Sequence, residues 1–237
     1  MSGVELHAFD DREALTAALA VTCAEALAHA IAKGGRASAA LSGGSTPAPL
    51  YLALAACPLD WTKVDLALVD ERWVDPADKA SNEGLLRACF APALRAGASF
   101  TAMKTAAASP AEALAEREPA HAALRPLDLV VLGMGPDGHT ASWFPNAEGL
   151  DAALDPENDR TLAAVRAVHS AVAGAYVERM TLTRPAVVEA ARVVMMITGE
   201  DKRDAFERAR AAGPENDAPV RALWRDADSD LDVYWAP

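Results

Sequence analysis

The stretch that most constrains the fold is a short apolar run that ends abruptly in breakers of regular structure. Residues 128–132 are rich in Leu and Val, which predicts a buried strand. A tight turn must follow, because the next residues include Gly133, Gly135, Pro136 and Gly138. Asp137 and His139 stand in this turn, an acid beside the side chain that titrates near neutrality. Because open α/β sheets bind ligands at the carboxyl ends of their strands, this turn is a predicted active site.

The three glycines of this turn also spell G-x-G-x-x-G, the fingerprint of a dinucleotide-binding loop. That fingerprint requires a helix at the last glycine and an acidic residue about 20 residues later, after a second strand. Pro145 interrupts the segment that would have to be the helix, and Asp151 and Asp155 lie in a polar stretch. We therefore interpret the glycines as a turn that brings backbone N–H groups to a substrate.

A second glycine-rich loop, SGGSTP at residues 42–47, follows a predicted strand at residues 37–41. Pro47 opens a helical pattern, and the free N–H groups and dipole of a helix N-terminus favour a phosphate. A capped turn with Thr46 as N-cap and nothing bound explains the segment equally well, since the G-K-[ST] ending of a Walker loop is missing. The candidate phosphate-binding residues here are Gly43, Gly44, Ser45 and Thr46.

Three consecutive charges end the next predicted strand, residues 64–69. Arg72 has the geometry to bind a phosphate through two donors, and Asp70 can accept a hydrogen bond from a sugar hydroxyl. A solvated turn is the plain alternative. Ser81 and Asn82 then open a helix, for which capping is the simplest explanation.

Strands and helices alternate along the whole chain. Further strands are predicted at residues 161–168, 179–183, 193–198 and 231–235, the last closing the sheet. Helices are predicted at residues 10–34, capped by Asp10 with Glu13, and at residues 81–95, 110–124, 185 onward and 200–212. This alternation, with no linker and no repeat, predicts a mostly parallel sheet with helices on both faces, in a single domain of residues 1–237.

Composition limits the partners of this chain. A net charge of −12 over 237 residues argues against nucleic acid or an anionic membrane, so an anionic substrate requires a local cluster of cations. No apolar run is expected to approach the ~20 residues of a membrane span. Three unclustered cysteines, Cys23, Cys57 and Cys89, predict buried reduced thiols in a cytosolic protein. We assign no function to three histidines, expecting His29 and His121 at the surface and His7 without a partner.

The motifs occur in an order that resembles the 6-phosphogluconolactonases. They are SGGSTP at residues 42–47, DERWV at 70–74, SN at 81–82, GMGPDGHTASWFP at 133–145, RMTLT at 179–183 and GEDKRDAF at 199–206. The wider group has a Rossmann-like fold and includes glucosamine-6-phosphate deaminases, which share the glycine loop and DGH but not the residues after it. Trp143 stands where the family more often has a smaller aliphatic residue, which bears on the shape of the pocket wall.

The resemblance implies hydrolysis of 6-phospho-D-glucono-1,5-lactone in the oxidative pentose phosphate pathway. Such an activated ester needs a water, a base and stabilisation of an oxyanion, but no redox cofactor. His139 suits the base, since imidazole has an unperturbed pKa of ~6.5, and Asp137 can orient it. Backbone N–H groups near Gly135 to Gly138 are expected to receive the oxyanion. No metal is expected, because Asp137 and His139 supply only two ligands.

The phosphate would be held by the loop at residues 43–46 together with Arg72, Arg179 and Lys202, with Asp70 and Asn82 beside the sugar. Two other functions remain open: an amino-sugar phosphate deaminase in which His139 assists ring opening, and a non-catalytic sugar-phosphate sensor. The sequence does not determine the number of subunits, and a cytoplasmic monomer is compatible with it.

Overall fold

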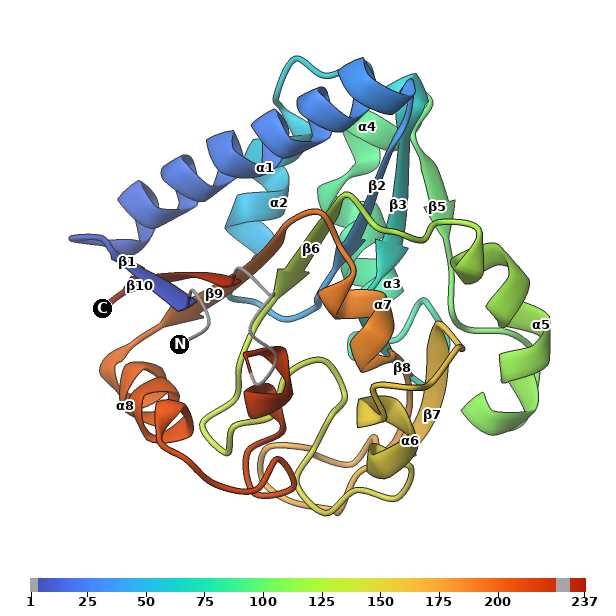
Figure 1. The fold of residues 1–237 in the computed structure, drawn as a ribbon. Coiled ribbons are helices and arrows are strands. Elements are labelled where there is room, and N and C mark those ends of the chain that lie inside the picture. Colours follow the sequence, from blue (N-terminus) through green and yellow to red (C-terminus); the bar gives the residue numbers. More distant parts are fainter. Residues whose placement is uncertain (1–3, 225–230) are drawn as a thin grey trace.

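The fold is built around a seven-stranded sheet, in a computed structural model that describes residues 4–224 and 231–237 (Figure 1). The strand order is β1-β10-β9-β6-β2-β3-β5, and every pairing between neighbours is parallel. The strands are β1 (Val4–Ala8), β2 (Ala37–Leu41), β3 (Val64–Leu68), β5 (Ser99–Thr101), β6 (Leu129–Leu132), β9 (Val193–Thr198) and β10 (Leu231–Ala236). The predicted parallel sheet is therefore confirmed.

A second sheet, which the sequence did not predict as a separate unit, holds three antiparallel strands. They are β4 (Asp70–Arg72), β8 (Glu178–Leu182) and β7 (Leu162–Arg166), in the order β4-β8-β7. Val69 joins the two sheets, because its N–H donates to Leu41 of β2 while its carbonyl accepts from Leu182 of β8. The chain thus leaves the large sheet after β3 and carries its charged residues to β8.

The helices cover the large sheet and flank the small one. They are α1 (Arg12–Gly34), α2 (Ala48–Ala55), α3 (Asn82–Cys89), α4 (Ala91–Arg95), α5 (Pro110–Ala122), α6 (Leu150–Leu154), α7 (Arg184–Val188) and α8 (Glu200–Arg210), with 3₁₀ turns η1 (Trp61–Lys63) and η2 (Pro219–Leu223). Helix α1 packs on α2 and on strands β2, β6 and β10, whereas α5 and α6 lie beside β7 (Figure 1).

Helix α1 shows why its sequence folds as predicted. The stripe of Leu15, Leu19, Cys23 and Leu27 is fully buried, and Gly35 ends the helix with a left-handed φ of 81°. The N-cap is Asp11, whose side chain accepts from Ala14, and not the predicted Asp10.

By length and composition α1 is nevertheless able to cross a membrane, alone among helices of the described residues. This corrects the expectation that no segment approaches such a span, although core helices pass the same test and one side of α1 is buried against the sheet.

Two predicted elements are placed differently. The helix predicted at residues 81–95 is two helices, α3 and α4, separated at Phe90, because Pro92 fits only the first turn of a new helix. Strand β10 does not close the sheet, since β1 pairs with its free side and forms the edge. Strand β1 was missed, although its five residues, VELHA, alternate between apolar and polar side chains.

The cysteines and the histidines to which we assigned no function differ in part from the expected burial and contacts. All three cysteines are free, but Cys57 is only partly buried; burial raises the pKa of Cys23 to about 12, which leaves an unreactive thiol. His29 is exposed as predicted. The expectation for His121 is wrong, because it is 1% exposed and burial lowers its pKa. His7 does have a partner, with Nε2 lying 3.1 Å from Asp232.

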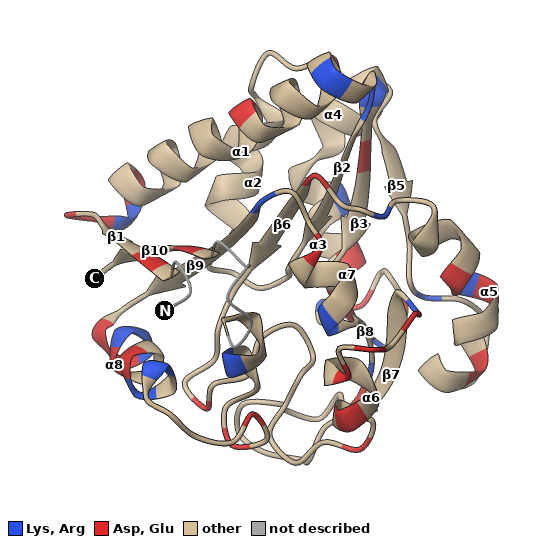
Figure 2. Cartoon of the chain, in the orientation of Figure 1, with Lys and Arg blue, Asp and Glu red and all other residues tan. Residues whose placement is uncertain are grey.

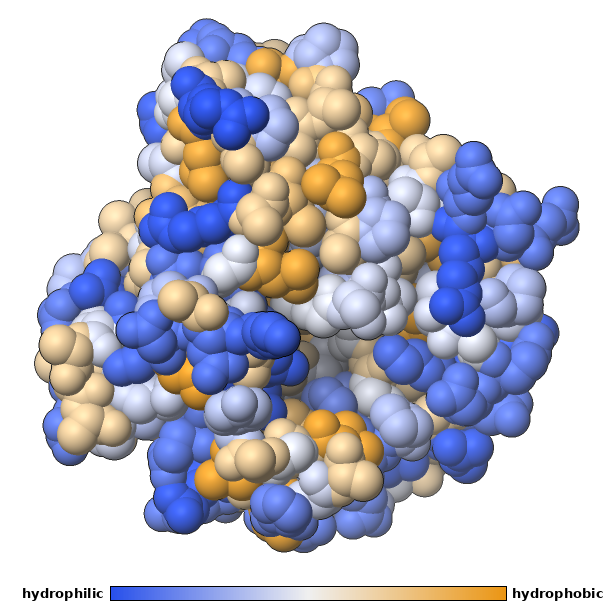
Figure 3. Space-filling model, turned by 180° about the vertical axis from the view of Figure 1, so that it is seen from behind, coloured by the Kyte–Doolittle hydropathy of each residue, from blue (hydrophilic) through white to orange (hydrophobic). Residues whose placement is uncertain are grey.

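The surface is mixed in charge and hydropathy. Acidic and basic residues alternate on α8, and acidic residues mark α5 and α6 (Figure 2). Apolar patches on the face seen in Figure 3 are separated by hydrophilic side chains. The exposed large apolar residues are Val21, Leu52, Val168, Val172 and Tyr176.

Candidate active site

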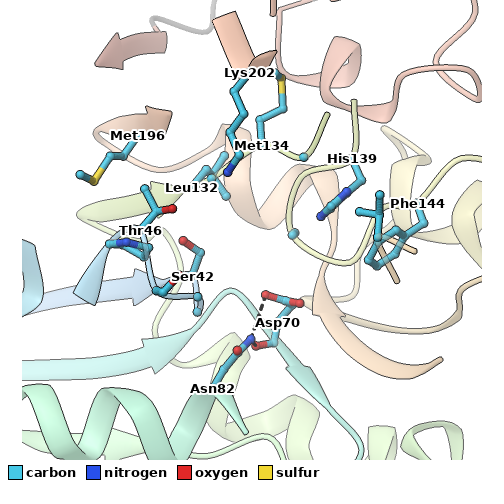
Figure 4. Close-up of a pocket in the computed structure, with 18 of the residues that line it drawn as sticks. Ser42, Thr46, Asp70, Asn82, Leu132, Met134, His139, Phe144, Met196 and Lys202 are labelled. Atoms are coloured by element: carbon cyan, nitrogen blue, oxygen red, sulfur yellow. Dashed lines mark hydrogen bonds between the residues drawn. The ribbon is translucent and has the colours of Figure 1, made fainter. Parts of the chain in front are cut away.

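The candidate site lies where the strand order of the large sheet reverses. From β2 the chain runs outward to β3 and β5, and then returns to form β6 on the other side of β2. The loops after β2 and β6 therefore part at the carboxyl edge and leave a crevice, which is the usual ligand position in such sheets. A cavity of about 310 Å³ occupies this place (Figure 4).

Most of the predicted site residues line this one cavity. They are Gly43, Gly44, Ser45, Thr46, Asp70, Arg72, Asn82, His139, Arg179 and Lys202. Figure 4 shows His139 and Lys202 pointing toward the space that Ser42 and Thr46 border from the other side. Asp137 does not line the cavity but lies behind His139. Segments that are far apart in the sequence thus meet as the motifs implied.

His139 is held firmly by its surroundings. Its Nδ1 lies 2.6 Å from Oδ1 of Asp137, so Nε2 is the nitrogen left for a water or a substrate. The ring stacks on Phe144 at a centroid distance of 4.3 Å. Gly135 is required beneath it, because a Cβ at that position would lie 2.2 Å from the imidazole.

Asp137 is poised to act through His139. Burial by itself raises the pKa of Asp137, but the hydrogen bond and the charge of His139 outweigh burial and hold that pKa below its usual range. An ionised Asp137 accepts from Nδ1–H and fixes the tautomer in which Nε2 carries the free lone pair.

The turn around His139 offers fewer free N–H groups than were expected for an oxyanion. The N–H of Gly135 donates to the carbonyl of His139, and that of Gly138 donates to the carbonyl of Gly135. The N–H of His139 donates to Asp137, and Pro136 has none. These bonds make the turn rigid and engage the N–H groups of Gly135 and Gly138, whereas the N–H of Asp137 donates to no backbone acceptor among the described residues.

The loop after β2 is different. Within the described residues, the N–H groups of Gly43, Gly44, Ser45 and Thr46 donate to no protein acceptor. The predicted cap is wrong, since the N-cap position of α2 is Pro47 and no side chain caps the helix. Free N–H groups next to a helix N-terminus favour an anion.

Asp70 is the centre of a buried polar network. Its Oδ2 accepts from Ser142 at 2.6 Å and lies 3.8 Å from a guanidinium nitrogen of Arg179. Asn82 donates to the backbone carbonyl of Asp70 at 2.8 Å and to Oδ1 at 3.3 Å. The left-handed backbone of Ala141, with φ 50°, turns the chain so that Ser142 reaches this carboxylate. Both oxygens of Asp70 are thus already engaged within the protein.

In the described part of the chain, three cationic side chains line the cavity, and they differ in their hydrogen-bond partners and in the effect of burial on their pKa. Arg72 donates to the carbonyl of Ala80 at 2.6 Å, and Arg179 donates to the carbonyls of Tyr176 and Ala173. Burial lowers the pKa of Arg179 to about 10, against the opposing charge of Asp70. Burial also lowers the pKa of Lys202. A bound anion would relieve the repulsion and desolvation that these cations bear.

Sequence reasoning missed several residues of this site. Ser142 and Phe144 stand inside the quoted DGHTASWFP motif, yet only the fold shows that they contact Asp70 and His139. Glu71 lies within the charged run after β3 and is fully buried. Trp143 is outside the set that lines the cavity; it is fully buried and its indole donates to Leu182, so it does not shape the wall.

Comparison with known proteins agrees with this geometry. A family model described as glucosamine-6-phosphate isomerases/6-phosphogluconolactonase matches residues 10–235. The chain belongs to this family. A member from Mesorhizobium japonicum named 6-phosphogluconolactonase is 44% identical over 98% of this chain and 94% of the relative. One of the same name from Rhizobium meliloti is 41% identical, with 98% of each chain covered.

Solved structures of the glucosamine-6-phosphate isomerase/6-phosphogluconolactonase family confirm the predicted Rossmann-like class. The crystal structure of a 6-phosphogluconolactonase from Shewanella baltica has a TM-score of 0.88 and 33% identity, covering 99% of this chain and 98% of that one. The dinucleotide interpretation loses its structural basis, because no helix begins at Gly138.

Proposed function

We propose that this protein is a hydrolase that converts 6-phospho-D-glucono-1,5-lactone to 6-phosphogluconate, the lactonase step of the oxidative pentose phosphate pathway. Family membership and the names of the relatives support the substrate. The observation that carries the chemistry is the His139–Asp137 pair, whose His139 borders the same cavity as Lys202 and a loop with free N–H groups.

His139 is the general base of this reaction. Nε2 takes a proton from a water as its oxygen attacks the lactone carbonyl carbon, which forms a tetrahedral oxyanion. The bond between that carbon and the ring oxygen then breaks, and the imidazolium returns the proton to the leaving oxygen. Asp137 stabilises the imidazolium between the two steps. The product is an open-chain acid with a free hydroxyl, and no atom stays on the enzyme.

The phosphate binds at the opposite end of the cavity. The free N–H groups of residues 43–46 and the ammonium group of Lys202 are its main ligands, and Arg72 adds positive charge. Arg179 contributes through Nη1, since its Nε and Nη2 groups already donate to backbone carbonyls. Asn82 and Asp70 line the part of the cavity between the phosphate and the lactone.

The reaction uses no metal and no redox cofactor. Asp137 and His139 bond to each other and are joined by no third ligand; the group of potential metal ligands in the described residues is Glu5, His7 and Asp232, on β1 and β10. This donor set supports catalysis by acid and base alone.

The chain acts as a single cytoplasmic domain with a small-molecule substrate and without nucleic acid or membrane. The net charge of −12 supports the absence of polyanionic partners, and one continuous core of buried residues includes members of both sheets.

The test is a lactonase assay with freshly generated 6-phosphogluconolactone, corrected for spontaneous opening. Rapid hydrolysis that survives exhaustive chelation is expected. Ammonia release from glucosamine 6-phosphate without lactonase activity would instead identify a deaminase. A ligand-induced thermal shift without any turnover would identify a sensor. Activity lost on chelation and restored by a divalent ion would refute the metal-free mechanism.

A further inference from the structure

A buried carboxylate next to the cavity has no role in the chemistry proposed above. Glu71 lies on β4 between Asp70 and Arg72, and it is 0% exposed. Its carboxylate accepts four hydrogen bonds of 2.7 to 2.9 Å, from the N–H groups of Arg72, Asn82 and Glu83 and from the hydroxyl of Ser81. All four partners act as donors, so the arrangement suits an ionised carboxylate.

These bonds tie the N-terminus of α3 to β4. Asn82 and Glu83 are the first two residues of α3, whose N–H groups have no partner within the helix. Ser81, which donates to Glu71, also caps the helix by accepting from Gly84 at 3.1 Å. Glu71 therefore fixes where α3 begins, and with it the position of the Asn82 side chain.

Asn82 links this anchor to the phosphate-binding loop. Its side chain donates to the backbone carbonyl of Asp70 and lies directly against Gly43, where an added Cβ would be 1.8 Å from Oδ1. The loop thus rests on Asn82, and a shift of Asn82 must move Gly43 and its free N–H group.

Arg72 is the second connection to the cavity. Its N–H donates to Glu71 at 2.7 Å, and its guanidinium, which borders the cavity, donates to the carbonyl of Ala80. Glu71 therefore positions both partners of the bond between Arg72 and Ala80. It accepts from the N–H of Arg72 and from the hydroxyl of Ser81, which directly follows Ala80.

We propose that Glu71 is a positioning residue for the phosphate subsite, acting through Asn82 and Arg72 without touching substrate. The inference rests on the proposed function for its substrate, but the subsite can be probed separately with inorganic phosphate. His139 and Asp137 belong to another loop, so the chemical step does not depend on Glu71 directly.

The test compares Glu71→Gln with a matched control, Glu83→Gln. Glutamine keeps the size of Glu71 but turns one acceptor into a donor that faces other donors. Glu83 is likewise buried, and its side chain pairs with Arg87 at 2.7 Å and not with Glu71, Asn82 or Arg72. Loss of either charge lowers the melting temperature, so stability alone does not distinguish the two variants.

In Glu71→Gln, KM for the phosphorylated lactone should rise about tenfold or more with kcat nearly unchanged, because weakened charge-assisted bonds displace the subsite. The affinity for inorganic phosphate, measured by calorimetry, should fall by a similar factor. The kcat/KM for unphosphorylated gluconolactone should stay at its wild-type value. Glu83→Gln should leave all three quantities unchanged. If Glu71→Gln does not fold, Ser81→Ala can replace it, because it removes one of the four donors to Glu71. This variant should show a smaller rise in KM and a smaller loss of phosphate affinity, with kcat nearly unchanged.

Equal changes in KM and phosphate affinity in Glu71→Gln and Glu83→Gln would show that Glu71 has only a structural role. Equal losses of kcat/KM on phosphorylated and unphosphorylated lactone would show the same. A wild-type protein that binds phosphate but hydrolyses no lactone would overturn the proposed function, while weaker phosphate binding by Glu71→Gln would still support the positioning role.

Discussion

The two glycine-rich loops of the site use their backbone in opposite ways. The loop at residues 43–46 leaves its N–H groups without protein acceptors, whereas the turn at residues 135–139 bonds the N–H groups of Gly135, Gly138 and His139 internally. The first loop is thus open to an anion, and the second is a rigid support for one imidazole. Similar glycine content in two loops therefore does not imply a similar role, and the hydrogen-bond partners decide between them.

The largest expected effect separates chemistry from binding at the rigid turn. His139→Asn keeps some hydrogen bonding but removes the general base, so kcat should fall by a factor of about 10² to 10⁴. Affinity for 6-phosphogluconate should change little, since the phosphate is held by the other loop. Steady-state kinetics and product binding measure the two quantities. A folded variant with most of its turnover would show that another group is the base.

The next prediction inserts a methyl group into each loop. Gly135→Ala places its Cβ 2.2 Å from the His139 ring, and kcat should fall by about 10² because the base is displaced. Gly43→Ala, with its Cβ 1.8 Å from Asn82, should instead raise KM.

Gly34→Ala is the control for both variants, because nothing lies within 4 Å of its added Cβ. If Gly135→Ala and Gly43→Ala change kcat and KM by the same factors, the two loops do not have the separate roles in catalysis and phosphate binding that we infer.

A smaller effect is expected from Lys202, the lysine that lines the cavity. Lys202→Ala should weaken binding of the phosphorylated substrate about tenfold to a hundredfold, since one charge-assisted contact contributes roughly 1.5 to 3 kcal/mol. Arg72→Ala should act in the same direction. Unphosphorylated gluconolactone should be a poor substrate for the wild type and insensitive to both changes. Equal turnover of the two lactones by the wild type would contradict the phosphate assignment.

The smallest effect is a dependence on alkaline pH. Burial lowers the pKa of Lys202 below its usual 10.5, so the ammonium form is lost earlier than in an exposed lysine as the pH rises. The KM for phosphorylated substrate should increase on the alkaline side below pH 10.5, and kcat should not follow it. In Lys202→Arg the rise of KM with alkaline pH should be smaller, because a guanidinium group keeps its charge. If KM rises with pH in that variant as it does in the wild type, Lys202 is not the group whose titration causes the increase.

The accuracy of the sequence interpretation differed between elements for physical reasons. The stripe of α1 and the apolar run of β9 were predictable, because burial imposes a period on the sequence. Strand β1, VELHA, does alternate apolar and polar residues, but it is only five residues long and pairs at the sheet edge, and this short pattern was not interpreted as a strand. His121 was expected at the surface, whereas tertiary packing buries it.

The sequence by itself determined most of the alternation of strands and helices, the two glycine-rich loops and the side chains that can do the chemistry. These follow from local rules of backbone geometry, periodicity and side-chain chemistry, and the motifs carry them in fixed spacing. Only the tertiary structure decided which N–H groups stay free, that Asp70 is bonded within the protein, and that Glu71 supports the site. Those features depend on partners up to 72 positions away, as for Ser142 and Asp70, and no local pattern specifies such contacts.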